Sequence, residues 1–129
     1  EPDGKIVLKL NQEEPYMVNI IAQRQGWFEI SSVTCFTSDL ELPSGPLWMH
    51  PSVLAATTRN YGPDEKIPVY AYPQKNESFI EDYLVGETEI RFIEFYFDFA
   101  HIHVESDGKT VDGWIEKNWI CGNPVTTCP

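Results

Sequence analysis

Two histidines, His101 and His103, alternate along an apolar stretch in the second half of the chain. If this stretch is a strand whose residues Ala100, Ile102 and Val104 face the core, both imidazoles project from the opposite face. Two imidazoles placed in this way can supply half of a metal site. The sequence offers no third and fourth ligand at a suitable spacing. We therefore expect no metal ion and no cofactor, and interpret both histidines as solvated strand residues.

Cys35 is the residue that could act as a nucleophile, because a thiolate activated by a histidine is the basis of the cysteine hydrolases. That chemistry needs a nearby general base and a third group that orients the base. The surrounding segment, SSVTCF, is apolar and β-branched and supplies neither. We expect a buried thiol and no catalytic residue, and a small cysteine hydrolase remains only an alternative.

Aromatic side chains are the better functional signal, since they make up 13% of the chain. Amphipathic rings form flat platforms for sugars or peptides and anchor interfaces. Trp27 and Phe99 take equivalent outward positions if the residue that follows each of them points inward. The alternative is that rings such as Trp48 and Trp114 fill a core or pack between two domains. The predicted ligand-binding residues are Trp27, Tyr61, Tyr72, Tyr96, Phe99, Trp114 and Trp119.

Cys121 and Cys128 bracket the loop CGNPVTTC, whose Gly, Asn and Pro residues turn the chain readily. The two sulfurs can therefore meet, and a disulfide across so short a loop would contribute about 2–3 kcal/mol on the chain-entropy estimate. We expect this disulfide and, with it, an oxidising compartment. Two reduced thiols are the alternative.

Composition and charge narrow the range of partners. Apolar residues make up 42% of the 129-residue chain, which is enough for a packed core, and the formal net charge is −11. Negative charge of this size repels phosphate backbones, so we expect no nucleic-acid partner. The sequence also lacks an apolar run of about 18 residues, so we expect no membrane span. No signal peptide is visible at its start.

The elements that must position these residues are strands. Short runs rich in Val, Ile, Tyr and Phe alternate with clusters of Gly, Pro, Asn and Asp, which is typical of a small all-β sandwich or barrel. Residues 50–62 have some helical character and are expected to form a turn or a short element. The predicted strands are residues 5–10, 16–22, 27–33, 67–72, 89–95, 99–105 and 113–120.

The two halves of the chain align with each other as an internal repeat. Residues 60–66 contain a Gly-Pro pair and three charges, and they are the best linker, so we expect one domain at 1–62 and another at 66–129. The aligned positions are Pro2 with Pro73, residues 27–30 with 99–102, Trp48 with Trp114, and residues 53–54 with 119–120.

One strand of the second half lacks a counterpart in the first half. A strand precedes Pro73, whereas only Glu1 precedes Pro2. We therefore expect the opening strand of the first domain to be missing or supplied from elsewhere, and the natural protein to be longer at its N-terminus.

The second half resembles the bacterial SH3-like domain family. It has an opening strand that ends near a proline, a Gly-led strand, an aromatic-x-x-Ile segment, an Asp-Gly-Lys turn, a Gly-Trp-Ile segment and a closing apolar pair. These features stand at residues 69–73, 86–90, 99–102, 107–109, 113–115 and 119–120. The first half matches more loosely, at residues 27–30, 48–49 and 53–54. Phe99 stands where the family has Trp, and Leu47 where it has Gly.

The resemblance implies an all-β chain of two small SH3-like β-barrels in tandem that bind rather than catalyse. Relatives are commonly attached to cell-wall enzymes or exported by bacteria, where they contact peptidoglycan or peptides. We therefore expect an exported binding module, periplasmic or on the cell surface, that recognises a cell-wall fragment or a peptide. A protein–protein interaction module or inhibitor, whose acidic face meets a basic target, is the alternative.

Overall fold

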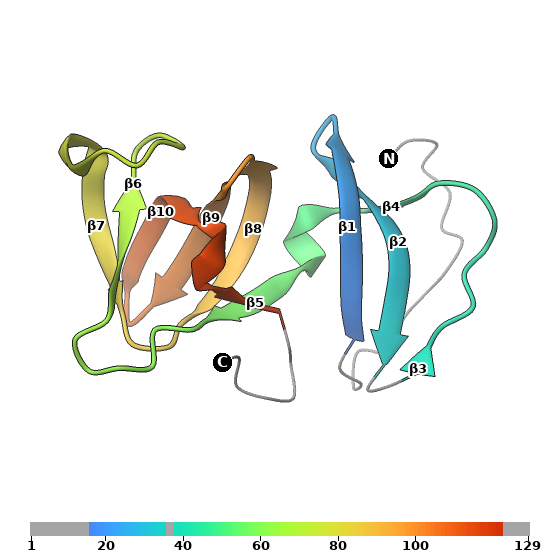
Figure 1. Cartoon of the computed structure of the whole chain (residues 1–129), viewed down its shortest axis with the longest axis horizontal. Helices are drawn as coiled ribbons and strands as arrows, with labels where there is room; N and C mark the ends of the chain where they lie inside the picture. Colours follow the sequence, from blue (N-terminus) through green and yellow to red (C-terminus); the bar gives the residue numbers. More distant parts are fainter. Residues whose placement is uncertain (1–15, 36–37, 123–129) are drawn as a thin grey trace.

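The computed structural model describes residues 16–35 and 38–122, and its regular elements are strands and short 3-10 helices (Figure 1). The predicted all-β class is therefore confirmed. The predicted strand at residues 5–10 and the predicted bonding partner Cys128 lie outside the described residues. The strands are β1 (Tyr16–Arg24), β2 (Trp27–Cys35), β3 (Ser38–Asp39), β4 (Leu47–Met49), β5 (Ala55–Thr58), β6 (Lys66–Tyr70), β7 (Ile80–Val85), β8 (Glu89–Tyr96), β9 (Phe99–Ser106), β10 (Lys109–Glu116) and β11 (Ile120–Cys121). The 3-10 helices are η1 (Pro51–Val53), η2 (Glu77–Phe79) and η3 (Lys117–Trp119).

The strands form two antiparallel sheets that lie side by side (Figure 1). In the smaller sheet, β2 pairs with β1, β3 and β4. The larger sheet has the order β11-β5-β8-β9-β10-β6-β7 and curls around its own core. His101, His103 and three of the seven predicted ligand-binding residues, Tyr96, Phe99 and Trp114, belong to strands of the larger sheet.

The chain passes from one sheet to the other at η1, ahead of the predicted linker at residues 60–66. Residues 50–62 are predicted to form a turn or a short element of the first domain, whereas they contain β5, a strand that pairs with β8 and β11 in the larger sheet. The physical reason is that β9 pairs with only one edge of β8, and the polar backbone groups of the other edge need a partner as well. The predicted domain limits, 1–62 and 66–129, do not coincide with this division of the sheets.

The hairpins β1–β2 and β8–β9 share their register. Four cross-strand pairs of the first recur in the second with every residue 72 positions later. Both hairpins also skip one residue at the same place as a β-bulge, Ile21 in β1 and Ile93 in β8. The pairs are Ile20–Ile30, Ala22–Glu29, Gln23–Phe28 and Arg24–Trp27 in one hairpin, and Phe92–Ile102, Glu94–His101, Phe95–Ala100 and Tyr96–Phe99 in the other. A bulge is not needed for a strand to alternate between apolar and polar residues. Its presence at the same place in both hairpins therefore supports the internal repeat.

The strand that follows each hairpin continues the correspondence. Trp48 lies opposite Glu29 in the smaller sheet, and Trp114 lies opposite His101 in the larger sheet. The two tryptophans are 66 positions apart (48 to 114), and η1 and η3 are separated by the same offset (51 to 117). The alignment of Trp48 with Trp114 therefore agrees with the paired structure.

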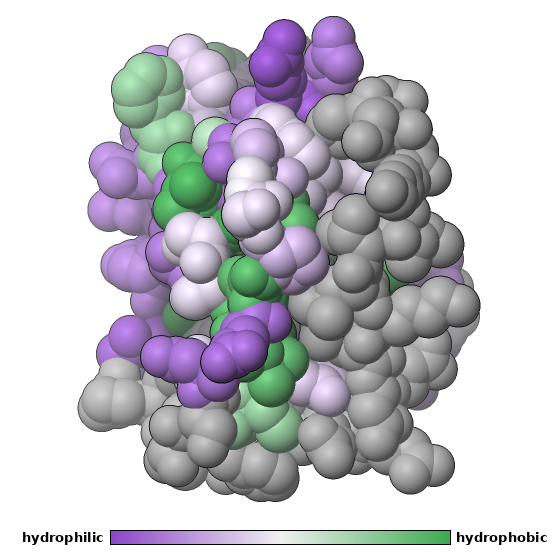
Figure 2. Space-filling model, turned by 90° about the vertical axis from the view of Figure 1, so that its right-hand side faces the viewer, coloured by the Kyte–Doolittle hydropathy of each residue, from purple (hydrophilic) through white to green (hydrophobic). Residues whose placement is uncertain are grey.

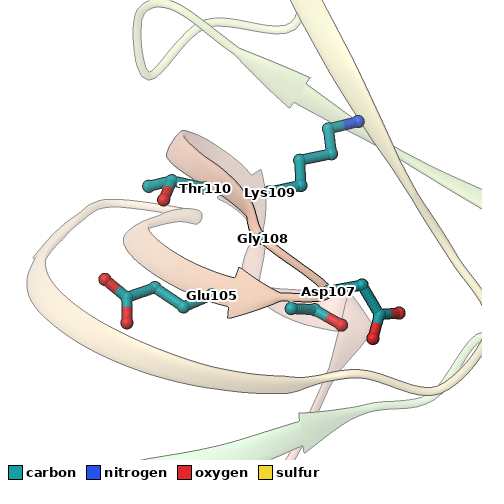
Figure 3. Close-up of a pocket in the computed structure, with 6 residues that line it drawn as sticks. Glu105, Asp107, Gly108, Lys109 and Thr110 are labelled. Atoms are coloured by element: carbon teal, nitrogen blue, oxygen red, sulfur yellow. The ribbon is translucent and has the colours of Figure 1, made fainter.

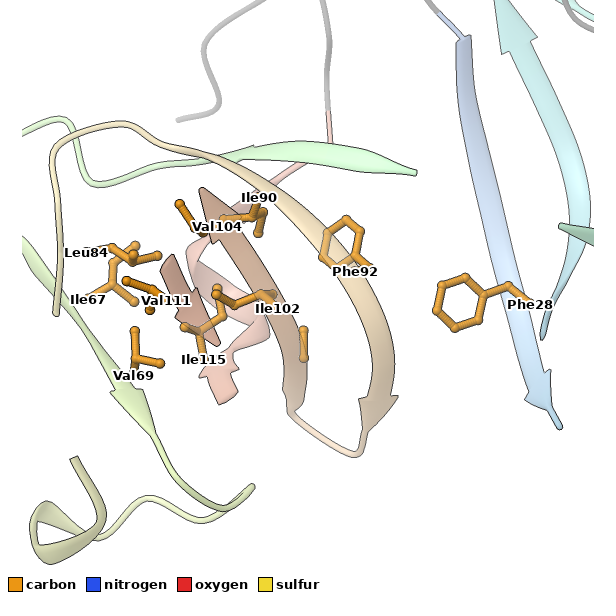
Figure 4. Packing of buried hydrophobic residues seen from close by; sticks show 11 residues of the cluster. Phe28, Ile67, Val69, Leu84, Ile90, Phe92, Ile102, Val104, Val111 and Ile115 are labelled. Atoms are coloured by element: carbon orange, nitrogen blue, oxygen red, sulfur yellow. The ribbon is translucent and has the colours of Figure 1, made fainter. Parts of the chain in front are cut away.

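The main core lies inside the larger sheet and includes one residue of the smaller sheet, Phe28 of β2 (Figure 4). The Phe28 ring lies 5.3 Å from the ring of Phe95. Next to this contact, the Gln23 side chain accepts a hydrogen bond from the Phe95 N–H at 2.8 Å and donates one to the Phe95 carbonyl. The amide of Gln23 thus takes the place of a strand partner and joins the two sheets.

A second, smaller cluster of buried residues lies within the smaller sheet and consists of Ile30, Val33 and Leu47. On the side of the molecule where the smaller sheet lies, apolar side chains form a strip that is bordered by polar ones (Figure 2). The smaller sheet therefore depends on the main core as well as on its own cluster.

Gly113 is required because β6 crosses β10 closely at this point. A Cβ atom there would lie 2.6 Å from Val69 Cγ1 and 2.9 Å from the Tyr70 carbonyl oxygen. Leu47 holds the corresponding place in β4, and among the described residues no strand pairs with β4 on the side away from β2. Gly113 is therefore needed in β10, whereas β4 can hold the larger Leu47 at the aligned position.

We predict that Gly113→Ala lowers the free energy of unfolding by about 2 kcal/mol, because the strands must move apart. Urea unfolding followed by circular dichroism measures the change. Gly122→Ala is the matched control, since an added Cβ there meets no atom within 4 Å. Equal stability of the two variants would contradict the predicted close approach of β6 and β10.

Candidate functional site

The predicted alternation of β9 is confirmed, and it carries the candidate site. Every second residue from Ala100 to Val104 is buried. Phe99, His101 and His103 lie half-buried on the opposite, outer face of the strand. The histidines are not simply solvated, because each is engaged by side chains of the neighbouring strands.

Asp112 of β10 lies between the two imidazoles. Its Oδ1 is 2.7 Å from His101 Nε2, and its Oδ2 is 3.2 Å from His103 Nδ1. The other nitrogen of His103 lies 3.2 Å from Glu105 Oε1. The other nitrogen of His101 is buried without a hydrogen-bond partner among the described residues, 3.9 Å from Glu94 Oε2. The result is a row of two histidines between three carboxylates.

The electrostatics of this row follow from its geometry. Hydrogen bonds to Glu105 and then to Asp112 raise the pKa of His103, and they outweigh the opposing effect of burial. Burial opposes the ionisation of Asp112, but the hydrogen bonds from His101 and His103 together lower its pKa below the ordinary value. The imidazolium of His103 and the carboxylate of Asp112 thus stabilise each other's charged form.

Trp114 covers one side of the row. Its ring is stacked on the His101 imidazole, with centroids 4.9 Å apart and planes 21° apart. Tyr96 meets the same indole edge-on at 6.5 Å, and Phe99 meets Tyr70 edge-on at 5.9 Å. We call these residues together the His–Trp face, which comprises Tyr70, Glu94, Tyr96, Phe99, His101, His103, Glu105, Asp112 and Trp114.

The structure brings together three of the seven predicted ligand-binding residues, Tyr96, Phe99 and Trp114. Tyr72 is exposed and packs edge-on against Phe79 of η2 at 5.1 Å. Trp27 belongs to the smaller sheet, where it meets His50 edge-on at 5.1 Å. The other two are Tyr61, which is exposed between β5 and β6, and Trp119, which packs against the main core.

Sequence reasoning missed Asp112, although a signal for it was present. The two-residue turn at Asp107 and Gly108 has positive φ at both positions, as tight hairpins require. A two-residue turn sets the register of the whole hairpin, and here it places Asp112 opposite His103 and Trp114 opposite His101. The turn therefore contained the information needed to predict the row.

The turn itself borders an open pocket that is lined by six consecutive residues, 105–110 (Figure 3). The side chains of Glu105 and Lys109 point in different directions there (Figure 3). A pocket with one short segment as its wall lacks the convergent groups that hold a ligand. The His–Trp face is therefore the stronger candidate site.

The cysteines do not join this face. Cys35 lies at the end of β2, in the smaller sheet, at the opposite end of the strand from Trp27 and its neighbour His50. Cys121 is disulfide-bonded, and the predicted partner Cys128 lies outside the described residues. Cys35 therefore lies in a different sheet from His101 and His103.

Two further properties concern the described part of the chain. No three His, Cys, Asp or Glu side chains within it are grouped so that they could hold a metal ion. None of its helices has the length and apolar character needed to cross a membrane.

The chain has no significant match among models of protein families, curated protein sequences or solved structures. The candidate site therefore rests on the geometry described above.

Proposed function

We propose that this chain is a non-catalytic binding module that recognises amine- or guanidinium-bearing peptides through the His–Trp face. The observation that carries the proposal is the row in which Trp114 stacks on His101 and Asp112 bridges both histidines. Aromatic rings supply rigid contact area at a small entropic cost, and the carboxylates supply charge that orients a cationic group.

The surroundings of the site favour a cation over an anion. Glu94 and Glu105 flank the histidines, and the whole chain carries a net charge of −11. An anionic glycan or nucleic acid would be repelled here, whereas a lysine, an arginine or a free amine would be attracted.

We further propose that the ligand is a peptide of the bacterial cell envelope, such as the peptide stem of peptidoglycan. The repeated hairpin register, the matching 3-10 helices η1 and η3, and the Gly113–Trp114 strand support two related SH3-like units, of which the larger sheet forms the more complete one. The bonded state of Cys121 supports an exported protein, periplasmic or on the cell surface, because disulfides persist in oxidising compartments.

Trp114→Ala tests the proposal. We expect it to weaken binding of an arginine-containing peptide, and retention on insoluble peptidoglycan, at least about tenfold, because the stacked platform is lost. Trp48→Ala is the matched control, since Trp48 lies opposite Glu29 instead of a histidine and should affect binding much less. Fluorescence anisotropy of the labelled peptide gives the dissociation constants. Failure of the wild-type chain to bind either ligand would refute the proposed function.

A second candidate function is a protein-binding inhibitor, and β7 favours it. β7 is the last strand of the larger sheet, and it exposes Tyr83 and Val85 beside the exposed Glu81. An exposed strand edge can receive a strand from a partner. Salt-sensitive capture of a basic protein that Tyr83→Ser abolishes and Trp114→Ala leaves unchanged would favour this candidate over the first.

A further inference from the structure

We propose that the His–Trp face releases its cationic ligand when the medium becomes acidic, with His103 as the group that takes up the proton. This inference rests on the proposed function, because it concerns the control of the same site. It also specifies that the bound group is an amine or a guanidinium.

The geometry around His103 favours its protonated form, because each of its two ring nitrogens faces a carboxylate. Nδ1 lies 3.2 Å from Asp112 Oδ2, and Nε2 lies 3.2 Å from Glu105 Oε1. An ionised carboxylate only accepts hydrogen bonds, and a neutral imidazole carries only one N–H. Neutral His103 can therefore satisfy one of its two carboxylates, whereas the imidazolium can donate to both at once.

The charged groups around the two histidines are predominantly negative. β8 contributes Glu94 opposite His101 and Arg91 opposite His103. The Arg91 guanidinium is already engaged by Glu89, at 3.1 Å. The remaining groups are Asp112 and Glu116 on β10 and Glu105 on β9 itself. Glu116 Oε1 lies 3.7 Å from Lys75 Nζ, so with neutral histidines the carboxylates available to a cation on the ligand are Glu94, Glu105 and Asp112.

Protonation changes this balance at the place where the ligand would bind. The imidazolium of His103 brings a positive charge to Asp112 and Glu105, the carboxylates that would otherwise attract the ligand. The raised pKa of His103 extends its charged state above the ordinary range of histidine, while the lowered pKa of Asp112 keeps that carboxylate ionised in mild acid. The proton and the ligand's cation therefore compete for the same carboxylates.

The experiment compares a fluorescein-labelled peptide of alternating glycine and arginine with the same peptide carrying citrulline in place of arginine. Anisotropy is measured at about pH 8.5 and about pH 5.5, on either side of the ordinary histidine pKa, at constant ionic strength. Arginine keeps its charge at both values, so the protein alone changes. We expect the arginine peptide to bind about fivefold more weakly at the lower pH, as one added charge at close range predicts.

The measured quantity is the dissociation constant of the arginine peptide at the lower pH divided by that at the higher pH. His103→Gln should reduce this ratio to near one. His50→Gln is the matched control and should keep the ratio, because His50 is exposed in another part of the chain, where its imidazole contacts Ser52 and Trp27. Glu105→Gln provides a second variant, at an exposed position, and should reduce the ratio partly.

The outcomes are distinguishable. A ratio of one in the wild type, or the same ratio in His103→Gln as in the wild type, would overturn the proton control and leave the proposed function standing. If the citrulline peptide bound as tightly as the arginine peptide, the proposal that the face recognises a cationic group would be overturned. Absence of all peptide binding at both pH values would refute the proposed function and this inference together.

Discussion

Phe28→Ala is expected to lower the free energy of unfolding by about 3–5 kcal/mol, the usual cost of removing a fully buried phenylalanine. The Phe28 side chain is 1% exposed and lies among residues of the larger sheet, although its own strand belongs to the smaller sheet. Its loss would leave a cavity between the sheets and remove the ring contact with Phe95. Stability should therefore fall in both sheets together.

Denaturant unfolding measures the total change, and amide hydrogen exchange shows where it occurs. We expect the amides of β2 and β9 to lose protection together, because the two sheets share one core. Phe97→Ala is the matched control, since Phe97 is 78% exposed and should contribute little to stability. Loss of protection in the smaller sheet alone would instead show that the two sheets unfold independently.

Asn60→Ala is expected to cost about 3 kcal/mol, because it leaves several buried polar groups without partners. Asn60 is 0% exposed and accepts a hydrogen bond from the Thr58 hydroxyl at 2.6 Å. Its Nδ2 donates to the carbonyl oxygens of Leu84 at 3.1 Å and Glu65 at 3.3 Å. This one amide therefore ties β5 to β7 and to the segment that precedes β6.

Thermal unfolding of the variant, followed by circular dichroism, measures the loss. Asn76→Ala is the matched control, since the exposed Asn76 side chain caps η2 and should contribute about 1 kcal/mol or less. A loss at Asn60 no larger than that at Asn76 would show that the carbonyls of Leu84 and Glu65 find water or other partners.

Several features of the fold were predictable from local sequence. Alternating apolar residues identified β9 and its two faces, and the pattern from Trp27 to Ile30 identified the matching part of β2. The turn at Asp107 and Gly108 contained the register that places Asp112 beside His103. These features are local, because side-chain alternation and turn conformation depend on only a few adjacent residues.

The sequence alone therefore determined the β class, the inward and outward faces of the strands, and the repeat that relates Trp48 to Trp114. Only the tertiary structure decided that β5 joins the larger sheet, that Phe28 enters the main core, and that Asn60 is buried. The reason is that the choice of partner depends on which strand edges and apolar surfaces remain open after the other elements have packed. That information is spread over the whole chain, and no local pattern contains it.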